Sequence, residues 1–354
     1  MKFSCEKNLL VSAISVASRT VAMKSAIPAL EGIYIRAGVK VMLSGYNLET
    51  GITVGVDAEI RETGEAIFPA RLFFDIVRKL PDDTVEVSVD ENFKVSIRGG
   101  ISSFSITAMS AEDYPELPDV ESEKGVVLPQ KQLKEMISGT IFAVSENQAR
   151  PIHTGCLFEV ADDGITVIAV DGYRLALRRW TPEGGVGRQM KFVAPAAALK
   201  EVEKILTDSD DDCTFYLGTK HILFTIGEAT LVCRILEGEF LDWRRVLPEN
   251  NPIKLAANVS AITDSIERVS LVISEKLKSP VRCTFGDQTA DFRTVSTIGT
   301  AHDVCQIAGD GKDLEIGFNC RYLLDALRAV PDGECMLELS NGLSPIVLTP
   351  CDDT

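Results

Sequence analysis

The stretch AVDGYRLALRR, residues 169–179, carries the densest set of reactive side chains in the sequence. Asp171, Tyr173 and Arg174 bring a carboxylate, a phenol and a guanidinium close together. An acid beside a phenol could move a proton and an arginine could stabilise an oxyanion, so a catalytic site is one interpretation. No second acid–base partner stands at a recognisable spacing, and this counts against an enzyme.

The same stretch also reads as a β-hairpin. The apolar runs TVIAV and RLALRRW flank Asp171-Gly172, a dipeptide typical of tight turns in which glycine supplies a positive φ. The earlier stretch LSGYNLET repeats the pattern, with three matches: Gly45 with Gly172, Tyr46 with Tyr173, and Leu48 with Leu175. We therefore predict one structural turn used twice, to which Asp171 and Arg174 were added in the second place.

A helix predicted three times along the chain indicates the architecture that positions these residues. The segments IFPARLFFDIVRKLPDD, KFVAPAAALKEVEKILTD and IGFNCRYLLDALRAVPDG each read as a strand, a turn, a helix and an acidic stop. Apolar residues recur three positions apart within each segment and about 125 residues apart between segments, which predicts one buried helix face. These residues are Phe74, Val77 and Leu80; Leu199, Val202 and Ile205; and Leu324, Leu327 and Val330.

The repeat predicts an α+β chain of three tandem copies of one domain. Each copy has an earlier helix after a short strand and alternating strands after the second helix, so two helices would cover one face of antiparallel sheets. Acidic, proline-bearing stretches place the boundaries at 1–122, 123–250 and 251–354. Only CMLELS and PIVLTP follow the second helix of the third copy, so we expect that copy to lack its last strand and to be less stable.

Composition excludes several classes of protein. The net charge of −16 argues against broad binding to nucleic acid or to an anionic membrane, although one surface could still be basic. The 9 cysteines form no C-x-x-C pair, which favours buried thiols in a reducing cytoplasm over disulfides or a zinc site. Phosphate-binding glycine loops and histidine metal motifs are absent from the sequence, and no apolar run could span a membrane. We expect a cytoplasmic protein without cofactor or metal.

A second stretch, GEFLDWRRVLPEN at 238–250, places arginines beside Trp243 and aliphatic side chains. It could anchor a domain boundary, or it could pair with the Asp171 stretch as one wall of an apolar groove. Arginines beside aromatic and aliphatic groups are typical of peptide-docking sites rather than of acid–base catalysis.

Several motifs taken together resemble the bacterial DNA polymerase III beta subunit family, the sliding clamps. They are MKFSCEKNLL, FPARLFFDIVRKLP, FSITAMSAEDYPELP, VDGYRLA, FLDWRRVLP, EIGFN and YLLDAL, in the family's order and spacing over essentially the whole chain. The resemblance implies three clamp domains with helices on the inner face and a head-to-tail homodimer that closes a ring. Double-stranded DNA would thread the hole without sequence readout, attracted by basic helix residues.

The function implied is that of a DNA sliding clamp, a processivity factor without catalytic activity. It would tether the DNA polymerase III alpha subunit, and other polymerases and repair proteins through short linear motifs, and a clamp-loader ATPase would open it. The alternative from the residues is a peptide-binding repeat scaffold that does not encircle DNA.

The resemblance also implies three groups of residues, which would otherwise read as solvated charge, a decorated turn and domain core. The DNA contacts would be Lys24, Arg71, Arg78, Arg150, Lys200, Lys204, Arg321 and Arg328. The partner-peptide pocket would be His153, Thr154, Val170, Gly172, Tyr173, Arg174, Leu175, Leu241, Arg245 and Val246. The dimer contact would join Phe104 and Ile106 of one chain to Val272 and Ile273, at the end of a third-copy helix, of the next.

Within the pocket we expect apolar walls from Val170, Leu175 and Val246, and rim donors from Arg174 and Arg245. Departures from the family pattern suggest where this chain differs. His153 stands at a usually more apolar position, which would change partner preference. Ala196 and Ala197 stand where relatives often carry basic residues, which would weaken the DNA contact there. A missing C-terminal strand would weaken partner binding.

Overall fold

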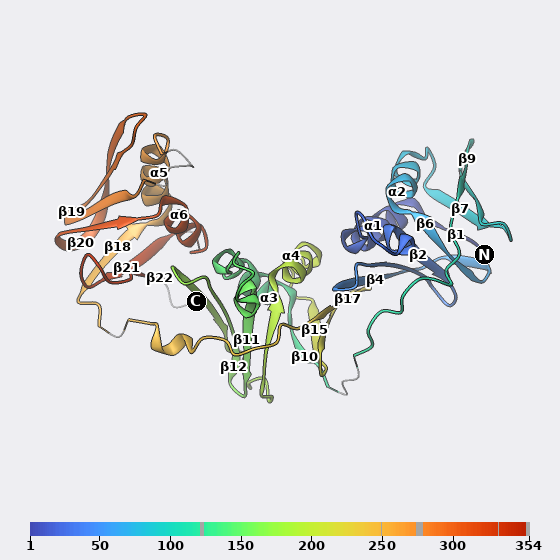
Figure 1. Ribbon diagram of the computed structural model, residues 1–354, viewed down its shortest axis with the longest axis horizontal. Coiled ribbons are helices and arrows are strands. Elements are labelled where there is room, and N and C mark those ends of the chain that lie inside the picture. The colour runs from blue at the N-terminus through green and yellow to red at the C-terminus, as the bar shows by residue number, and fades with distance from the viewer. Residues whose placement is uncertain (121–123, 249, 274–278, 332, 352–354) are drawn as a thin grey trace. The chain divides into compact units, whose positions relative to one another are not determined.

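We describe the protein from a computed structural model of residues 1–354 (Figure 1). The structure describes residues 1–120, 124–248, 250–273, 279–331 and 333–351. The chain divides into two compact units. Unit 1 comprises Met1–Ile137, Asn147–Val167 and Arg179–Gly238, and unit 2 comprises Ser138–Glu146, Ile168–Arg178 and Glu239–Thr354.

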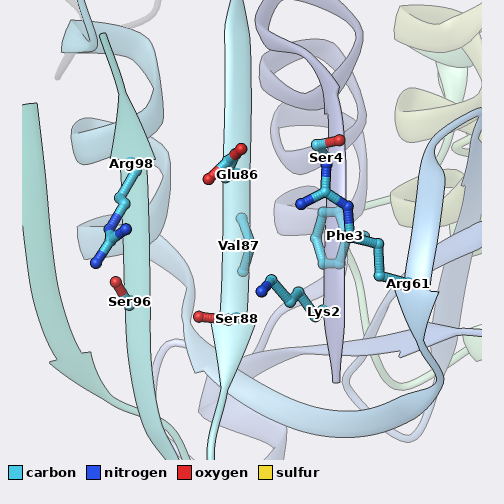
Figure 2. Close-up of a pocket in the computed structure, with 9 residues that line it drawn as sticks. All are labelled: Lys2, Phe3, Ser4, Arg61, Glu86, Val87, Ser88, Ser96 and Arg98. Atoms are coloured by element: carbon cyan, nitrogen blue, oxygen red, sulfur yellow. The ribbon is translucent and has the colours of Figure 1, made fainter. Parts of the chain in front are cut away.

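The first copy follows the predicted order of strand, helix, strands, helix and strands. Its elements are β1 (Lys2–Glu6), α1 (Lys7–Ala17), η1 (Ser18–Thr20), η2 (Pro28–Glu31), β2 (Gly32–Ala37), β3 (Val41–Tyr46), β4 (Thr50–Val56), β5 (Glu59–Glu62), β6 (Gly64–Pro69), α2 (Ala70–Lys79), β7 (Thr84–Val89), β8 (Lys94–Gly99) and β9 (Ser102–Thr107). One sheet has the order β5-β1-β7-β8-β9, so β9, which carries Phe104 and Ile106, is an edge strand. Figure 2 shows Lys2 on β1, Glu86 on β7 and Arg98 on β8 along this sheet.

The second copy repeats the order. Its elements are β10 (Val126–Pro129), α3 (Gln130–Ser138), η3 (Ile141–Ala143), η4 (Pro151–Thr154), β11 (Gly155–Ala161), β12 (Gly164–Val170), β13 (Leu175–Trp180), β14 (Met190–Pro195), α4 (Ala196–Ile205), β15 (Asp212–Leu217), β16 (His221–Ile226), β17 (Ala229–Arg234) and η5 (Trp243–Arg245). A four-stranded sheet has the order β13-β12-β11-β14.

The third copy is built from β18 (Ile253–Asn258), α5 (Val259–Ser270), β19 (Val281–Val295), β20 (Thr300–Phe318), α6 (Cys320–Arg328), β21 (Glu334–Leu339) and β22 (Val347–Pro350). The sheet order is β19-β20-β18-β21-β22. β21 and β22 are the two strands predicted after the second helix, while residues 352–354 lie outside the described residues. Because α5 ends at Ser270, Val272 and Ile273 follow the helix rather than end it, which corrects the prediction.

The first two copies share one sheet, which the repeat did not predict. The eight-stranded sheet has the order β10-β15-β16-β17-β4-β3-β2-β6. At its centre β17 of the second copy pairs antiparallel with β4 of the first, from Ala229 opposite Val54 to Cys233 opposite Thr50. Two edge strands thereby satisfy each other's backbone donors and acceptors within unit 1.

The repeated helices bury the face that the spacing predicts, with two exceptions. Val77, Val202 and Leu327 are each 0% exposed. Phe74 and Ile205 are only half-buried. The buried stripe of an amphipathic helix is wider than one residue, so a single row of positions three apart does not mark all of it. The adjacent positions Phe73, Ala198 and Leu323 complete that stripe in each copy and are 0%, 0% and 7% exposed. Among the described residues, no helix is long and apolar enough to cross a membrane.

A close approach at Gly45, inside β3, generates a test of the packing between α1 and the sheet. A Cβ there would lie 2.1 Å from the Ala17 carbonyl oxygen, which is closer than atoms can pack. We expect Gly45→Ala to lower the free energy of unfolding by about 1–3 kcal/mol, measured by chemical denaturation. The control is Gly38→Ala, whose Cβ would meet nothing within 4 Å and should change stability little. An equal effect of both substitutions would contradict this account.

Candidate functional site

The turn between β12 and β13 is the hairpin that the sequence predicts. The Asp171 amide donates to the Arg174 carbonyl at 3.3 Å. One Asp171 carboxylate oxygen, Oδ1, accepts from the amides of Tyr173 at 2.9 Å and Arg174 at 3.1 Å. Gly172 has a φ of 94°, the left-handed conformation that glycine adopts without strain. Asp171 therefore closes the turn, and Gly172 permits it, as predicted.

The related turn of the first copy uses a different residue from the one predicted. Asn47 Oδ1 accepts from the amides of Glu49 at 3.0 Å and Thr50 at 2.7 Å, and the Asn47 amide donates to the Thr50 carbonyl at 3.2 Å. Leu48 takes the positive φ, at 74°. Asn47 is thus the counterpart of Asp171, because both residues directly follow a strand and cap the next turn with a side-chain oxygen.

The predicted match of the two Gly-Tyr pairs is therefore wrong. Gly45 and Tyr46 lie inside β3, before the turn, and Tyr46 is 7% exposed. Tyr173 lies within the turn and is 84% exposed. The letters match at an offset of three residues from the alignment of the strand ends, which pairs Tyr46 with Val170 and Asn47 with Asp171.

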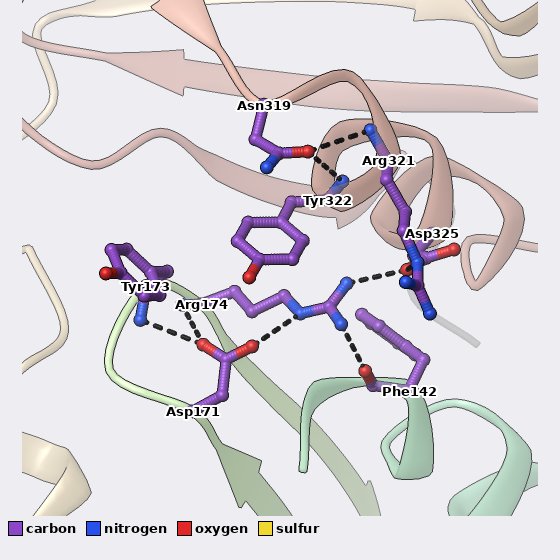
Figure 3. Close-up of polar contacts among 8 residues, drawn as sticks. All are labelled: Phe142, Asp171, Tyr173, Arg174, Asn319, Arg321, Tyr322 and Asp325. Atoms are coloured by element: carbon purple, nitrogen blue, oxygen red, sulfur yellow. Dashed lines mark hydrogen bonds and ion pairs between the residues drawn. The ribbon is translucent and has the colours of Figure 1, made fainter. Parts of the chain in front are cut away.

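Arg174 is held at the centre of unit 2 (Figure 3). Its Nε donates to Asp171 Oδ2 at 3.0 Å and its Nη1 donates to Asp325 Oδ2, on α6, at 2.7 Å. Its Nη2 donates to the Phe142 carbonyl at 2.5 Å. The guanidinium also lies over two rings, 4.3 Å from the centroid of Tyr322 and 5.3 Å from that of Phe142. One side chain thus ties together a turn, a 3-10 segment and a helix.

This geometry corrects the expected role of Arg174 as a rim donor. The side chain is 15% exposed, and each of its three nitrogens donates within the unit. It also argues against acid–base catalysis by Asp171, because both of that carboxylate's oxygens accept hydrogen bonds and its side chain is 10% exposed. Of Asp171, Tyr173 and Arg174, the exposed side chain is that of Tyr173, whose ring centroid lies 5.9 Å from that of Tyr322.

The start of α6 fixes the position of Tyr322. Asn319 caps the helix, because its Oδ1 accepts from the amides of Arg321 at 3.1 Å and Tyr322 at 3.4 Å. Sequence reasoning missed Asn319, Tyr322, Asp325 and Phe142. An Asn before a helix is a recognisable cap signal, but nothing local in the sequence points from Phe142 or Asp325 to Arg174.

The remaining pocket residues divide between the units. In unit 2, Val170 is 4% exposed and Leu175 half-buried, whereas Leu241 and Val246 are 41% and 43% exposed. Arg245 has a side chain that is 87% exposed and pairs with Asp242 at 3.0 Å, so it keeps donors for the solvent side. His153 and Thr154 belong to unit 1, in η4. Burial, with the nearby Arg150 charge, lowers the pKa of His153 and favours its neutral form.

The basic residues proposed for DNA are all exposed, but half of them already face acids. Four pairs lie within the units: Arg78 with Asp75 at 3.4 Å, Lys204 with Glu201 at 2.7 Å, Arg321 with Asp325 at 3.9 Å, and Arg328 with Glu267 at 2.7 Å. For the other half, Lys24, Arg71, Arg150 and Lys200, no ion pair occurs in the described ranges. Ala196 is 7% exposed, so only Ala197 occupies a surface position at the start of α4.

The residues proposed for a dimer contact are exposed or partly buried, and Ile273 packs against the hydrophobic core of the third copy. Phe104 on β9 is 40% exposed, and Ile106, Val272 and Ile273 are half-buried. The Val272 carbonyl accepts a hydrogen bond from Ser296 Oγ at 2.5 Å, which places it beside the turn that precedes β20. The interpretation of these four as ordinary core is therefore contradicted for Phe104, which is exposed on an edge strand, but not for Ile273, which packs against the third-copy core.

In the part of the chain that the structure describes, no group of three or more His, Cys, Asp or Glu residues could hold a metal. Burial raises the pKa of Cys233 to about 12 and that of Cys213 to about 12, so neither thiol is activated as a nucleophile.

Comparison with known proteins places this fold in a family. Models described as the N-terminal, central and C-terminal domains of the DNA polymerase III beta subunit match residues 1–118, 127–242 and 244–354. The beta sliding clamp of Staphylococcus epidermidis is 32% identical over 369 residues, covering 100% of this chain and 96% of the relative.

Solved structures agree. A structure of a putative DNA polymerase III beta subunit from Eubacterium rectale has a TM-score of 0.93 and 33% identity, covering 100% of this chain and 96% of that one. The DNA polymerase sliding clamp of Bacillus subtilis has a TM-score of 0.94 and 28% identity, with coverage of 100% and 96%.

The central position of Arg174 predicts a stability effect. Arg174→Ala removes the cation between Asp171 and Asp325 and the donor to the Phe142 carbonyl, so we expect the free energy of unfolding to fall by roughly 2–4 kcal/mol in chemical denaturation. Arg245→Ala, at an exposed arginine of the same unit, should change it by less than about 0.5 kcal/mol. If the two variants were equally stable, Arg174 would not be the tie that its contacts indicate.

Proposed function

The chain belongs to the DNA polymerase III beta subunit family and functions as a DNA sliding clamp, a processivity factor that is not itself catalytic, and from this premise we propose how its surfaces do that work. Two copies would close head to tail into a ring around double-stranded DNA. The ring would hold the DNA polymerase III alpha subunit and other partners on the template. The peptide-binding scaffold is not supported, because the relatives that match the whole chain are sliding clamps.

The observation that carries ring closure is the exposure of β9. β9 and β17 occupy the same place in their copies, as the third strand after the second helix. Leu231 on β17 faces Phe224 on β16 and is 1% exposed, and β4 pairs with its strand. Phe104 faces Ile97 in the same way but is 40% exposed on an edge strand. β9 therefore lacks the cover that β4 gives β17.

A second copy of the chain offers that cover. The start of β20, Thr300–Gln306, pairs with β19 on one side. The pairing of β20 with β18 lies beyond this segment, at Ala308 opposite Ala256. We take this segment as the third-copy counterpart of β4, because it pairs antiparallel with the end of the strand before it, β19, as β4 pairs with β3. Val304 is 43% exposed there, and Val272 lies beside the preceding turn. We propose that β9 pairs with this segment of the other chain, as β17 pairs with β4.

Contact with DNA would come from exposed basic residues that keep no acidic partner. Lys24, Arg71 and Arg150 lie in the first two copies, and Lys200 lies on α4. Cations already paired with acids attract phosphate less strongly, so these residues would carry most of the attraction and Arg78, Lys204, Arg321 and Arg328 less. A net charge of −16 over the chain suits a ring that is held by topology and slides rather than one that grips DNA tightly.

Partners would dock short linear motifs on exposed residues of unit 2, the unit that contains the Asp171 turn. Leu241 and Val246 supply aliphatic surface, Tyr173 an aromatic ring and Arg245 an available donor. Repair proteins, other polymerases and the clamp-loader ATPase that opens the ring would use the same pocket as the alpha subunit. We infer that the protein works in the cytoplasm, in keeping with its 9 free cysteines.

Ring closure predicts that the protein is a dimer that stays on circular DNA but slides off linear DNA. After loading, the protein should co-migrate with nicked circular plasmid in gel filtration and be lost when the plasmid is cut once. Phe104→Arg should give monomers in analytical ultracentrifugation at micromolar concentration, because it places a charge on the β9 contact.

The matched control for that variant is Val39→Arg, which adds the same charge at a 101% exposed position of the same copy and should remain dimeric. A wild-type monomer at micromolar concentration, or equal retention on circular and linear DNA, would overturn the ring.

The partner pocket predicts a separable binding defect. Val246→Asp should weaken binding of a fluorescent peptide carrying aliphatic and aromatic anchors by at least about tenfold in fluorescence anisotropy, because a buried charge opposes an apolar contact. Val127→Asp, at a 53% exposed valine on β10, should bind the peptide like the wild type. Both variants should remain dimeric, and an unchanged peptide affinity in Val246→Asp would exclude this residue from the pocket.

A further inference from the structure

A hollow lies on the solvent face of the sheet that contains β1, β7 and β8 in unit 1 (Figure 2). Its volume is about 160 Å³, and it is lined by Lys2, Phe3, Ser4, Arg61, Glu86, Val87, Ser88, Ser96 and Arg98. The space exceeds the ~30 Å³ that a water molecule occupies in the liquid, so it can hold a group of several atoms. None of the residues proposed for DNA, peptide or dimer contacts lines it.

Strand register explains why the sheet is hollow there. Lys2 lies opposite Ser88, and Ser88 lies opposite Ser96, so these side chains form one row across three strands. The next row on the same face holds Ser4, Glu86 and Arg98. Small serines in the middle and long charged side chains at the sides leave a floor of hydroxyls between walls. The buried side chains Phe3, Val87 and Ile97 alternate with them and pack on the opposite face.

Two cations at this hollow have no acidic partner. Within the described residues, neither Lys2 nor Arg98 makes an ion pair, although the chain has 52 acidic residues. Figure 2 shows the Lys2 ammonium and the Arg98 guanidinium turned toward the Ser88 and Ser96 row, while the Glu86 carboxylate points toward the other end of the hollow.

The other charges nearby are already satisfied or stand apart. Arg61 is held by Glu59 at 3.3 Å, and Ser4 Oγ donates to the same carboxylate at 3.4 Å. Glu62 lies opposite Lys2 on β5 but forms no ion pair with it in the described part of the chain. The end of the hollow at Ser88 and Ser96 is therefore its basic end.

We propose that the hollow binds a phosphate-class oxyanion at Lys2, Ser88, Ser96 and Arg98. A guanidinium offers a planar fork of donors, an ammonium a point charge and two hydroxyls further donors, which together match the oxygens of a phosphate group. The group could be inorganic phosphate itself or the terminal phosphate of a nucleotide, since both present the same oxygens. The site is independent of ring closure, because it lies on the sheet face and not on the β9 edge contact.

The test is a titration of the full-length protein with inorganic phosphate at constant ionic strength, with sodium chloride as the compensating salt. Amide NMR signals of residues in β1, β7 and β8 should shift along a saturable curve. Arg98→Gln should weaken the apparent affinity by about tenfold or more, because it removes a charge-assisted pair of donors. Arg98→Lys keeps the positive charge but lacks the guanidinium fork, so its apparent phosphate affinity should lie between those of the wild type and Arg98→Gln.

The matched control is Arg36→Gln, at an exposed arginine on β2 of the same unit that does not line the hollow. It carries the same change of net charge and should bind phosphate like the wild type. Arg98→Gln should still be retained on circular DNA, so loss of the anion site is distinguishable from loss of the clamp.

A second arm replaces phosphate with ADP. Saturation of the same amides at lower concentration would identify a nucleotide phosphate as the better ligand, and saturation by phosphate alone would identify the free anion. Linear shifts that never saturate, or identical curves for wild type, Arg98→Gln and Arg98→Lys, would overturn the proposal.

Discussion

The pairing of sheet edges is the constraint on which the rest of this structure depends. An edge strand exposes backbone donors, acceptors and the apolar side chains of one face, and only another strand satisfies all three. Within unit 1 the edge of β17 is completed by β4, and the side chains on it are buried. The same repeated unit leaves β9 uncompleted. A chain made of tandem copies therefore completes one such edge internally and leaves β9 as the edge that we propose a second chain covers.

Arg174 illustrates how a residue that looks functional can be structural. Its guanidinium donates one hydrogen bond from each nitrogen, to two carboxylates and a carbonyl, and also lies near two aromatic rings. It contributes to a surface by fixing the turn that presents Tyr173, which is largely exposed. Arg245, although it is part of a similar arginine-rich stretch, lies on the surface and pairs with Asp242, three residues before it. The two stretches have similar compositions, but the Arg174 side chain is largely buried whereas the Arg245 side chain is exposed.

The distribution of charge follows the same logic. The surface of an acidic chain that encircles DNA cannot attract DNA phosphates everywhere. The positions of its unpaired cations therefore matter more than their number. Several basic residues of the repeated helices are neutralised by acids on the same or a neighbouring helix. Lys2 and Arg98, by contrast, make no ion pair in the described structure, at a hollow that none of the proposed DNA contacts lines.

Local chemistry let the sequence alone determine the threefold repeat, the helices and the turn at Asp171. Helix periodicity and turn capping depend on residues a few positions apart, so Val77, Val202, Leu327 and Asp171 could be placed from spacing. The alignment of the first-copy turn with the Asp171 turn could not be predicted in this way, because the sequence allows a match through Gly45 as well as one through Asn47. Only the position at which the strand ends shows that Asn47 corresponds to Asp171. The partners of Arg174, which lie 32 and 151 residues away at Phe142 and Asp325, and the joining of β17 to β4 were decided by tertiary structure. Such contacts depend on which surfaces meet after folding, and no short-range pattern records that.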